Sequence, residues 1–238
     1  MDIYKSLKEE AYEANIEIPH RNLAIYTWGN VSAFDPEKSV FAIKPSGVDY
    51  DKLKPDSMVI VDLDGKVVAG SLNPSSDTET HRVLYREFFQ AGADIRGITH
   101  THSPYATAWA QARRPVPVFG TTHADYGAET IPCTEYISKD VTKNNYEEET
   151  GNLIVDTFKK QNKNPQYMPM VLVAGHGPFT WGRQSAAQAV YHAAVLEEIC
   201  KIAHFTLALN PHAAPLPDHI IRIHWERKHG PDATYGQR

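Results

Sequence analysis

The sequence predicts an α/β fold, a single domain over residues 1–238 whose mixed, largely antiparallel sheet carries helices on both faces. Three observations carry this prediction. The chain of 238 residues is long enough to bury one full core. Segments with apolar residues at helical spacing alternate with short β-branched runs. The Asp64-Gly65 pair, between two such runs, is a strong hairpin signal and excludes a sheet built only from parallel strand–helix–strand units.

Composition narrows the function classes. A formal net charge of −5 gives no electrostatic support to a nucleic-acid or anionic-membrane partner, and no apolar run approaches the length of a membrane span. The two cysteines, Cys133 and Cys200, form no disulfide framework or metal-type spacing. With no apolar signal segment behind Met1, we expect a cytoplasmic protein.

The first third of the chain reads as one helix followed by strands. Ile3, Leu7, Ala11 and Ala14 recur at helical spacing with charged residues between them. A glycine inside the next apolar run, at Gly29, suggests a bulge or a close backbone approach. We therefore expect, in order, a helix over 2–15, an interrupted strand over 23–34, a strand over 40–43, and hairpin strands over 58–63 and 66–69.

The rest of the chain alternates helices and strands. Ser185 stands where a helix N-cap is favoured, and the proline-bearing stretch 210–217 reads as a linker. The expected elements are, in order, a helix from 78 to near Gly92, a strand over 95–102, a helix over 103–113, a strand and loop over 118–126, a helix over 147–160, a strand over 170–173, and helices over 185–209 and 218–228.

A pair of histidines at the end of the 95–102 strand suggests a metal site. Residues two apart in a strand share a face, so His100 and His102 point together. His176, between two glycines after a buried strand, is the best third ligand, and Asp77 is a plausible fourth. The alternatives are ordinary strand histidines, a loop histidine bonded to a carbonyl, and an N-cap role for the aspartate. Competing histidines, which we expect to be mostly packed or solvated, are His81, His123, His192, His204 and His224.

Two short segments have the chemistry of a phosphate site. Backbone N–H groups, hydroxyls and a cation hold phosphate groups in proteins. Lys44-Pro45-Ser46-Gly47 supplies a turn with a lysine, and Ser75-Ser76 precedes a helix. Each segment is a weak signal alone, but together they would make a local anion site in an acidic protein.

Several motifs, in order along nearly the whole chain, resemble the L-ribulose-5-phosphate 4-epimerases of the class II aldolase/adducin superfamily. The paired histidines alone would indicate only the superfamily. The matching stretches are Thr27-Trp28-Gly29-Asn30-Val31-Ser32-Ala33, Lys44-Pro45-Ser46-Gly47-Val48-Asp49-Tyr50, Pro74-Ser75-Ser76-Asp77-Thr78, His100-Thr101-His102-Ser103, Gly120-Thr121-Thr122-His123-Ala124-Asp125-Tyr126, Glu149-Thr150-Gly151-Asn152, Gly175-His176-Gly177-Pro178-Phe179 and Tyr235-Gly236-Gln237.

The resemblance implies a role for each matching position. It implies the class II aldolase-like fold and a metal held by Asp77, His100, His102 and His176. It implies Asp125 and Tyr235 as the acid/base pair, reaching the site from a neighbouring subunit of a fourfold-symmetric homotetramer. Substrate and phosphate contacts fall on Asn30, Lys44, Ser46, Gly47, Ser75 and Ser76, and further site-lining positions on Thr121, Glu147 and His224.

The implied activity is a metal-dependent isomerase of pentose phosphate metabolism, for example in arabinose catabolism. It would interconvert L-ribulose 5-phosphate and D-xylulose 5-phosphate by retro-aldol cleavage of C3–C4 and re-addition. Three histidines and a carboxylate suit Zn²⁺, with Mn²⁺ and Co²⁺ as alternatives. The rivals are a class II aldolase for a deoxyketose 1-phosphate, whose family carries Glu where this chain has Asp77, a non-catalytic adducin-like module, and a zinc-stabilised structural domain.

Overall fold

One seven-stranded antiparallel sheet organises the chain. The computed structural model describes residues 2–141, 145–230 and 233. The strand order is β4-β3-β2-β1-β5-β7-β6. Every strand pair in it is antiparallel, and the parallel element of the predicted sheet is reduced to an isolated Cys133–Leu172 bridge. The strands are β1 Asn30–Asp35, β2 Val40–Ile43, β3 Val59–Asp62, β4 Val67–Ala69, β5 Gly97–His100, β6 Met170–Val173 and β7 Gly177–Gly182.

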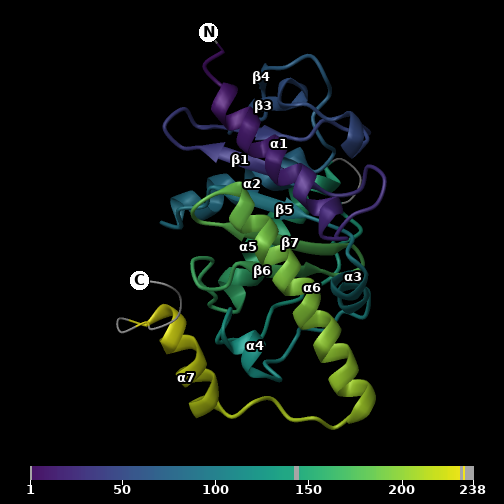
Figure 1. The fold of residues 1–238 in the computed structure, drawn as a ribbon, viewed down its shortest axis with the longest axis vertical. Helices are drawn as coiled ribbons and strands as arrows, with labels where there is room; N and C mark the ends of the chain where they lie inside the picture. Colours follow the sequence, from purple (N-terminus) through teal and green to yellow (C-terminus); the bar gives the residue numbers. More distant parts are fainter. Residues whose placement is uncertain (1, 142–144, 231–232, 234–238) are drawn as a thin grey trace.

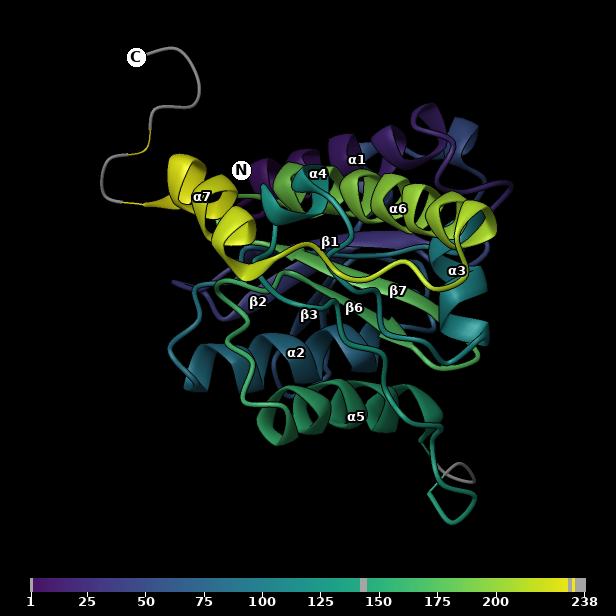
Figure 2. The same ribbon diagram turned by 90° about the horizontal axis from the view of Figure 1, so that it is seen from below.

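Helices cover both faces of the sheet, as predicted. Helices α1 and α6 lie on one face, and α2 and α5 lie on the other (Figure 2). Among the described residues, none of the helices combines the length and the apolar composition that a membrane span requires. The helices are α1 Lys5–His20, α2 Thr78–Gln90, α3 Pro104–Gln111, α4 Thr121–Ala124, α5 Tyr146–Lys160, α6 Ala186–Leu209 and α7 Asp218–His229, with short 3₁₀ turns η1 Tyr50–Lys52 and η2 Pro55–Ser57.

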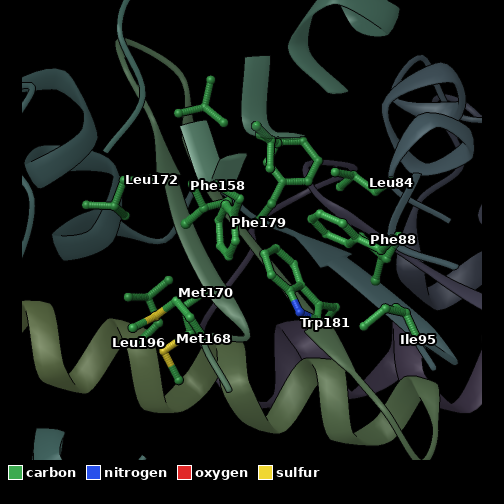
Figure 3. Packing of buried hydrophobic residues seen from close by; sticks show 14 of the residues in the cluster. Leu84, Phe88, Ile95, Phe158, Met168, Met170, Leu172, Phe179, Trp181 and Leu196 are labelled. Carbon is green, nitrogen blue, oxygen red and sulfur yellow. The ribbon is translucent and has the colours of Figure 1, made fainter. Parts of the chain in front are cut away.

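The core packs aromatic side chains from two helices against the sheet. Phe88 of α2 and Phe158 of α5 contact the Trp181 ring of β7, with ring centroids 4.9 and 5.3 Å apart (Figure 3). The Trp181 indole N–H donates to the Pro165 carbonyl oxygen, so its one polar atom is satisfied. This packing fixes β7, the strand beside β5, within the sheet.

The elements predicted over 23–34 and over 118–126 were wrong in part. The strand expected over 23–34 begins only at Asn30. Tyr26 and Gly29 have positive φ, and the Tyr50 hydroxyl donates to the carbonyl oxygens of Trp28 and Gly29, so this segment is held as a turn. The strand and loop expected over 118–126 contain the short helix α4, closed by the Asp125 N–H donating to the Thr121 carbonyl oxygen.

One strand, β7, is absent from the prediction. Its sequence begins Gly177-Pro178, which reads as a chain break because proline cannot donate to a ladder. In the structure Pro178 lies opposite Leu172 in the pair with β6, and its carbonyl oxygen accepts bonds from the β5 side. The chain therefore turns at His176 and returns along β6 as a hairpin.

Glu197 of α6 fixes the start of α3, immediately after the paired histidines. Its two carboxylate oxygens accept the backbone N–H groups of Tyr105 and Ala106 at 2.9 and 2.8 Å. These N–H groups lie in the first turn of α3, where no carbonyl of the helix can reach them. The Glu197 carboxylate of α6 therefore caps the N-terminus of α3, as an N-cap side chain would.

We expect Glu197→Ala to lower the free energy of unfolding by about 2–3 kcal/mol, because two charge-assisted bonds to backbone groups are lost. Urea unfolding followed by circular dichroism measures this. The control is Glu198→Ala, whose carboxylate pairs with exposed Lys201 and should change stability by less than about 0.5 kcal/mol. Equal effects of the two substitutions would contradict the capping role.

Candidate metal and phosphate site

Three histidines meet where β5 and the β6–β7 hairpin end. His100 is the last residue of β5 and lies between Asn30 of β1 and Phe179 of β7 in the sheet register. His102 follows two residues later, and His176 lies in the β6–β7 turn. The strand ends earlier than predicted, yet His100 and His102 still face each other, with their Nε2 atoms 3.1 Å apart. The ligand atoms of all three histidines lie within 4.8 Å of one another.

The hydrogen bonding of the cluster fits a divalent cation. His100 Nδ1 lies 3.0 Å from the Pro178 carbonyl oxygen, which can only accept, so the ring N–H is at Nδ1 and Nε2 carries the free lone pair. A tetrahedral ion with bonds of about 2.0–2.1 Å would hold two nitrogens about 3.3 Å apart, close to the observed spacing. His176 Nδ1 is buried and has no hydrogen-bond partner among the described residues.

The three rings are held in the neutral form that binds metals. Burial lowers the pKa of His100 to about 3, and it lowers the pKa of His102 and of His176 as well. Neutral imidazoles at physiological pH can donate lone pairs to a cation without first losing a proton.

Asp77 lies beside the histidines at the start of α2. Burial alone would raise its pKa, but the electrostatic effect of His100 and His81 and a 2.7 Å hydrogen bond from Asn30 Nδ2 to Oδ2 outweigh burial and lower the pKa. The side chain caps no backbone group of α2, so the N-cap alternative receives no support from its hydrogen bonds. The carboxylate is therefore ionised next to the cluster, although it is outside the set of mutually close ligand atoms.

A cavity of about 480 Å³ opens beside His102 and Asp77. Every residue that the sequence predicted for substrate and phosphate contacts lines it, from three separate segments of the chain. These residues are Asn30, Lys44, Ser46, Gly47, Ser75 and Ser76. Two of the segments are joined by backbone bonds, since Ser75 N–H donates to the Lys44 carbonyl and Ser46 N–H to the Asn73 carbonyl.

Lys44 supplies the positive charge of this cavity. The side chain is only 2% exposed, and its ammonium contacts the carbonyl oxygens of Thr27 and Pro45 and the face of Tyr50. Among the described residues, the Asp49 carboxylate acts on this ammonium electrostatically, but its ion pair is with Lys52. Burial lowers the pKa of Lys44 to about 8. A buried ammonium favours an anionic ligand.

Trp28 lines the cavity although it is not among the predicted site residues. Its ring is 52% exposed and lies 6.1 Å from the His102 ring. Next to it, a side chain at Gly29 would put its Cβ 2.8 Å from the His100 carbonyl oxygen, so only glycine allows this close approach. The only sequence signal for Trp28 was its place in the Thr27-Trp28-Gly29-Asn30 motif, and the motif does not indicate what the tryptophan does.

Asp125 and His224 form a second group, which shares no residue with the histidine cluster. Asp125 follows α4 and His224 lies on α7, and these two helices contact each other in the lower part of Figure 1. His224 Nδ1 is 3.0 Å from Asp125 Oδ1, and Arg227 and Lys228 approach Oδ2 at 3.2 and 3.4 Å. Burial opposes ionisation, but the His224 bond and these cations lower the pKa of Asp125. Thr121, at the start of α4, belongs to this group.

Of the two remaining predicted site residues, the structure describes Glu147 but not Tyr235. Glu147, in the first turn of α5, accepts the Thr80 hydroxyl through its backbone carbonyl at 2.6 Å, which ties α5 to the start of α2. Its neighbour Tyr146, not selected from the sequence, lies 6.1 Å from the His176 ring. Tyr235 lies outside the described residues.

Comparison with known proteins gives a family and close relatives. The family described as Class II Aldolase and Adducin N-terminal domain matches residues 9–204. Proteins named L-ribulose-5-phosphate 4-epimerase UlaF from Salmonella paratyphi C (strain RKS4594) and Salmonella typhi are 46% and 45% identical over 234 residues, which cover 98% of this chain and 100% of each relative.

Solved structures share the fold. An L-fuculose 1-phosphate aldolase superposes with a TM-score of 0.75 at 27% identity, covering 93% of this chain and 95% of its own. An L-fuculose-1-phosphate aldolase from Thermus thermophilus, at 21% identity and a TM-score of 0.63, covers 88% of this chain and 98% of its own. The second likeness shows the fold alone.

Proposed function

The chain belongs to the class II aldolase and adducin family, and on that premise we propose that it is an isomerase that interconverts L-ribulose 5-phosphate and D-xylulose 5-phosphate at C4. Relatives that match it over nearly their whole length carry the epimerase name. The structural observation that carries the proposal is the cavity that runs from Lys44 and the serines to His102 and Asp77. It offers a site for a phosphate at one end and for a cation at the other.

The cavity suits the two ends of a pentulose 5-phosphate. At the phosphate end, the Lys44 ammonium and the hydroxyls of Ser46, Ser75 and Ser76 can hold a dianion through charge-assisted bonds. At the other end, His100, His102 and His176, with Asp77 beside them, would hold a divalent cation. Such a cation would supply Lewis-acid polarisation of the carbonyl and adjacent hydroxyl oxygens.

Side chains of the protein would then transfer the protons and hold the substrate fragments in place. A base removes the C4 hydroxyl proton, the C3–C4 bond breaks, and glycolaldehyde phosphate separates from the enediolate of dihydroxyacetone. The aldehyde rotates and C3 adds to its other face, after which an acid returns the proton. Asp125, whose carboxylate is ionised at neutral pH, is suited to accept the hydroxyl proton, and Tyr235 is suited to donate a proton to the new alkoxide on the opposite face. The phosphate contacts must hold the aldehyde while it turns.

We propose that Asp125 acts on the substrate bound at the histidine cluster of a neighbouring subunit. Within one chain, the contacts of Asp125 are to α4 and α7, and none of those described is to the histidines of the cluster. A symmetric homotetramer with sites between adjacent subunits would bring the two groups together at each contact.

We assign Zn²⁺ to the cation site and the cytoplasm as the location. Three imidazoles and a carboxylate suit zinc, although Mn²⁺ and Co²⁺ prefer overlapping ligands. Cys133 and Cys200 are both free thiols, which agrees with a reducing compartment.

A class II aldolase is the second candidate, because a solved aldolase shares the fold at 27% identity. The resemblance separates the two at position 77, where this chain has the Asp of the epimerases. The test is product analysis of the purified zinc-loaded protein with L-ribulose 5-phosphate. The proposal expects D-xylulose 5-phosphate, and no product after chelation. Free glycolaldehyde phosphate as the main product would instead identify an aldolase.

The phosphate contact can be tested at Lys44. We expect Lys44→Met to raise KM for L-ribulose 5-phosphate about 10- to 100-fold, because a charged hydrogen bond contributes about 1.5–3 kcal/mol. Steady-state kinetics measure it, and Lys66→Met, on the exposed β3–β4 turn, is the control that should leave KM unchanged. An unchanged KM in Lys44→Met would mean that the phosphate binds elsewhere.

The lowered pKa of Lys44 gives the reaction a basic limit. The ammonium is charged below pH about 8 and neutral above it, so kcat/KM should fall as pH rises through about 8. At low pH, protonation of the phosphate monoester, whose second pKa is about 6, sets the other limb. In Lys44→Arg the guanidinium stays charged, so the basic limb should move upward, even if activity is lower. A basic limb unchanged in Lys44→Arg would assign it to another group.

A further inference from the structure

Three residues of β1 contact, one after another, the residue before α2 and two residues one and two turns into that helix. Asn30 Nδ2 donates to Asp77 Oδ2 at 2.7 Å. Ser32 Oγ lies 2.7 Å from both His81 Nδ1 and the Tyr85 hydroxyl. The Phe34 ring stacks on Tyr85 at 4.6 Å. We call these six residues the β1–α2 ladder.

The ladder is a match of two periodicities. Alternate residues of a strand lie about 6.7 Å apart on one face, and residues four apart in a helix lie about 6 Å apart on one face. Positions 30, 32 and 34 therefore align with 77, 81 and 85. Because α2 begins directly after Asp77, any shift of α2 along β1 would move the Asp77 carboxylate relative to the histidine cluster.

His81 is the ladder residue of α2 that lies one turn after Asp77, and one of its ring nitrogens is buried without a hydrogen bond to any described residue. The side chain is fully buried, and Nε2 has no hydrogen-bond partner among the described residues. Its ring packs on the edge of Phe179, which in turn stacks on His100 at 4.3 Å. A buried polar atom left unpaired costs free energy, so its retention here needs a reason.

The hydrogen bonds of the ladder hold the His81 ring through Nδ1. Burial lowers the pKa of His81 to about 4, so the ring is neutral and carries one N–H. Ser32 Oγ bonds Nδ1 of this ring and the Tyr85 hydroxyl together, and the Tyr85 hydroxyl also donates to the Ser32 carbonyl oxygen at 3.2 Å. The negative charge of Asp77 acts on the same ring, because it raises the pKa of His81 against the effect of burial.

We propose that His81 is a positioning residue, which holds the Asp77 carboxylate at the cation site through the β1–α2 ladder. This inference rests on the role proposed above for Asp77. Asn30 fixes one carboxylate oxygen directly, while His81 stabilises the negative charge from the next turn of α2 and fixes the position of that helix along β1. The electrostatic interaction of this buried ring with the Asp77 carboxylate gives a reason for its retention.

The test is a double-mutant cycle on zinc affinity, measured by competition with a chromophoric chelator and without substrate. Partners of metal-binding groups contribute about 10- to 100-fold to metal affinity. We expect His81→Phe to weaken zinc binding about tenfold and Asp77→Asn to weaken it more. The double variant should match Asp77→Asn within about twofold, because His81 acts through that carboxylate.

Two further variants sharpen the result. His81→Gln, which restores a side-chain N–H, should recover most of the affinity that His81→Phe loses. The matched control is His123→Phe, since His123 is likewise buried with an unpartnered Nδ1 but lies on α4, and its zinc affinity should stay at the wild-type value. If His81→Phe does not fold, as judged by circular dichroism, Ser32→Ala takes its place in the cycle, because it removes only one hydroxyl.

Independent losses that multiply in the double variant, or wild-type zinc affinity in a folded His81→Phe or Ser32→Ala, would overturn the inference. These outcomes do not bear on the epimerase proposal, which depends on product analysis of the wild type. Conversely, a wild-type protein that binds zinc with the expected coupling but makes no D-xylulose 5-phosphate would reject the proposed function and keep the ladder.

Discussion

His102→Asn should abolish turnover and release the bound cation in the same step. His102 Nε2 faces His100 Nε2 at 3.1 Å, and asparagine is too short to bring a nitrogen to that point. Loss of one of three converging imidazoles breaks a preformed coordination shell, so we expect zinc affinity to fall by more than about 100-fold, beyond the effect of losing an outer partner. Zinc per subunit, measured by atomic emission after gel filtration, should drop to near zero.

The control for this variant is His204→Asn, because His204 is an exposed histidine of α6 outside the cluster. It should keep wild-type zinc content and rate. Circular dichroism should show His102→Asn folded, since the residue follows the end of β5 and lines the cavity. Full zinc occupancy in a folded His102→Asn protein would remove the histidine cluster as the metal site.

Asp125→Asn should keep the fold and the bound cation but lose about 10²–10⁴-fold in kcat, the range for removal of a general base. Asparagine preserves the shape of the side chain, and its oxygen can still accept a hydrogen bond from His224 or Arg227. The control is Asp94→Asn, whose exposed carboxylate pairs with Arg96 rather than with a site residue. It should keep the wild-type rate.

Mixing the two inactive proteins tests the shared site. In oligomers reassembled from equal amounts of His102→Asn and Asp125→Asn subunits, about one contact in four should join an intact histidine cluster to an intact Asp125. The mixture should therefore regain up to about a quarter of the wild-type rate. Hybrids demonstrated by native mass spectrometry that stay as inactive as either parent would refute the sharing of sites between subunits.

The elements with simple local signals were predictable from the sequence. The Asp64-Gly65 turn indicated the β3–β4 hairpin, and Ser185, whose hydroxyl accepts the Gln188 N–H, indicated the start of α6. β7 was not predictable in the same way, because Pro178 reads as a breaker unless its neighbours on both sides are known. The loss of strand before Asn30 depends likewise on Tyr50, a residue distant in sequence.

In the candidate site too, residues with local signals were predictable, and residues that depend on distant partners were not. His100 and His102 could be paired from their spacing alone, and the phosphate segments from their chemistry. His81 could not be distinguished from the other helical histidines, because its role comes from a strand partner, Ser32, that lies 49 positions earlier. Trp28 stood in a motif, but only the structure shows that it lines the cavity beside the His102 ring.

The histidine cluster also links metal binding to the stability of the folded protein. Its ligands come from the end of β5, from the residues just after it and from the β6–β7 turn, far apart along the chain, and they converge only once the central strands are in register. An unfolded chain has no such convergence, so a cation that binds there selects the native state by mass action. Free zinc at about 100 times its dissociation constant would then add about 2.7 kcal/mol to the stability of the protein. The supply of metal in the cell would thus govern how long the enzyme survives, as well as how fast it works.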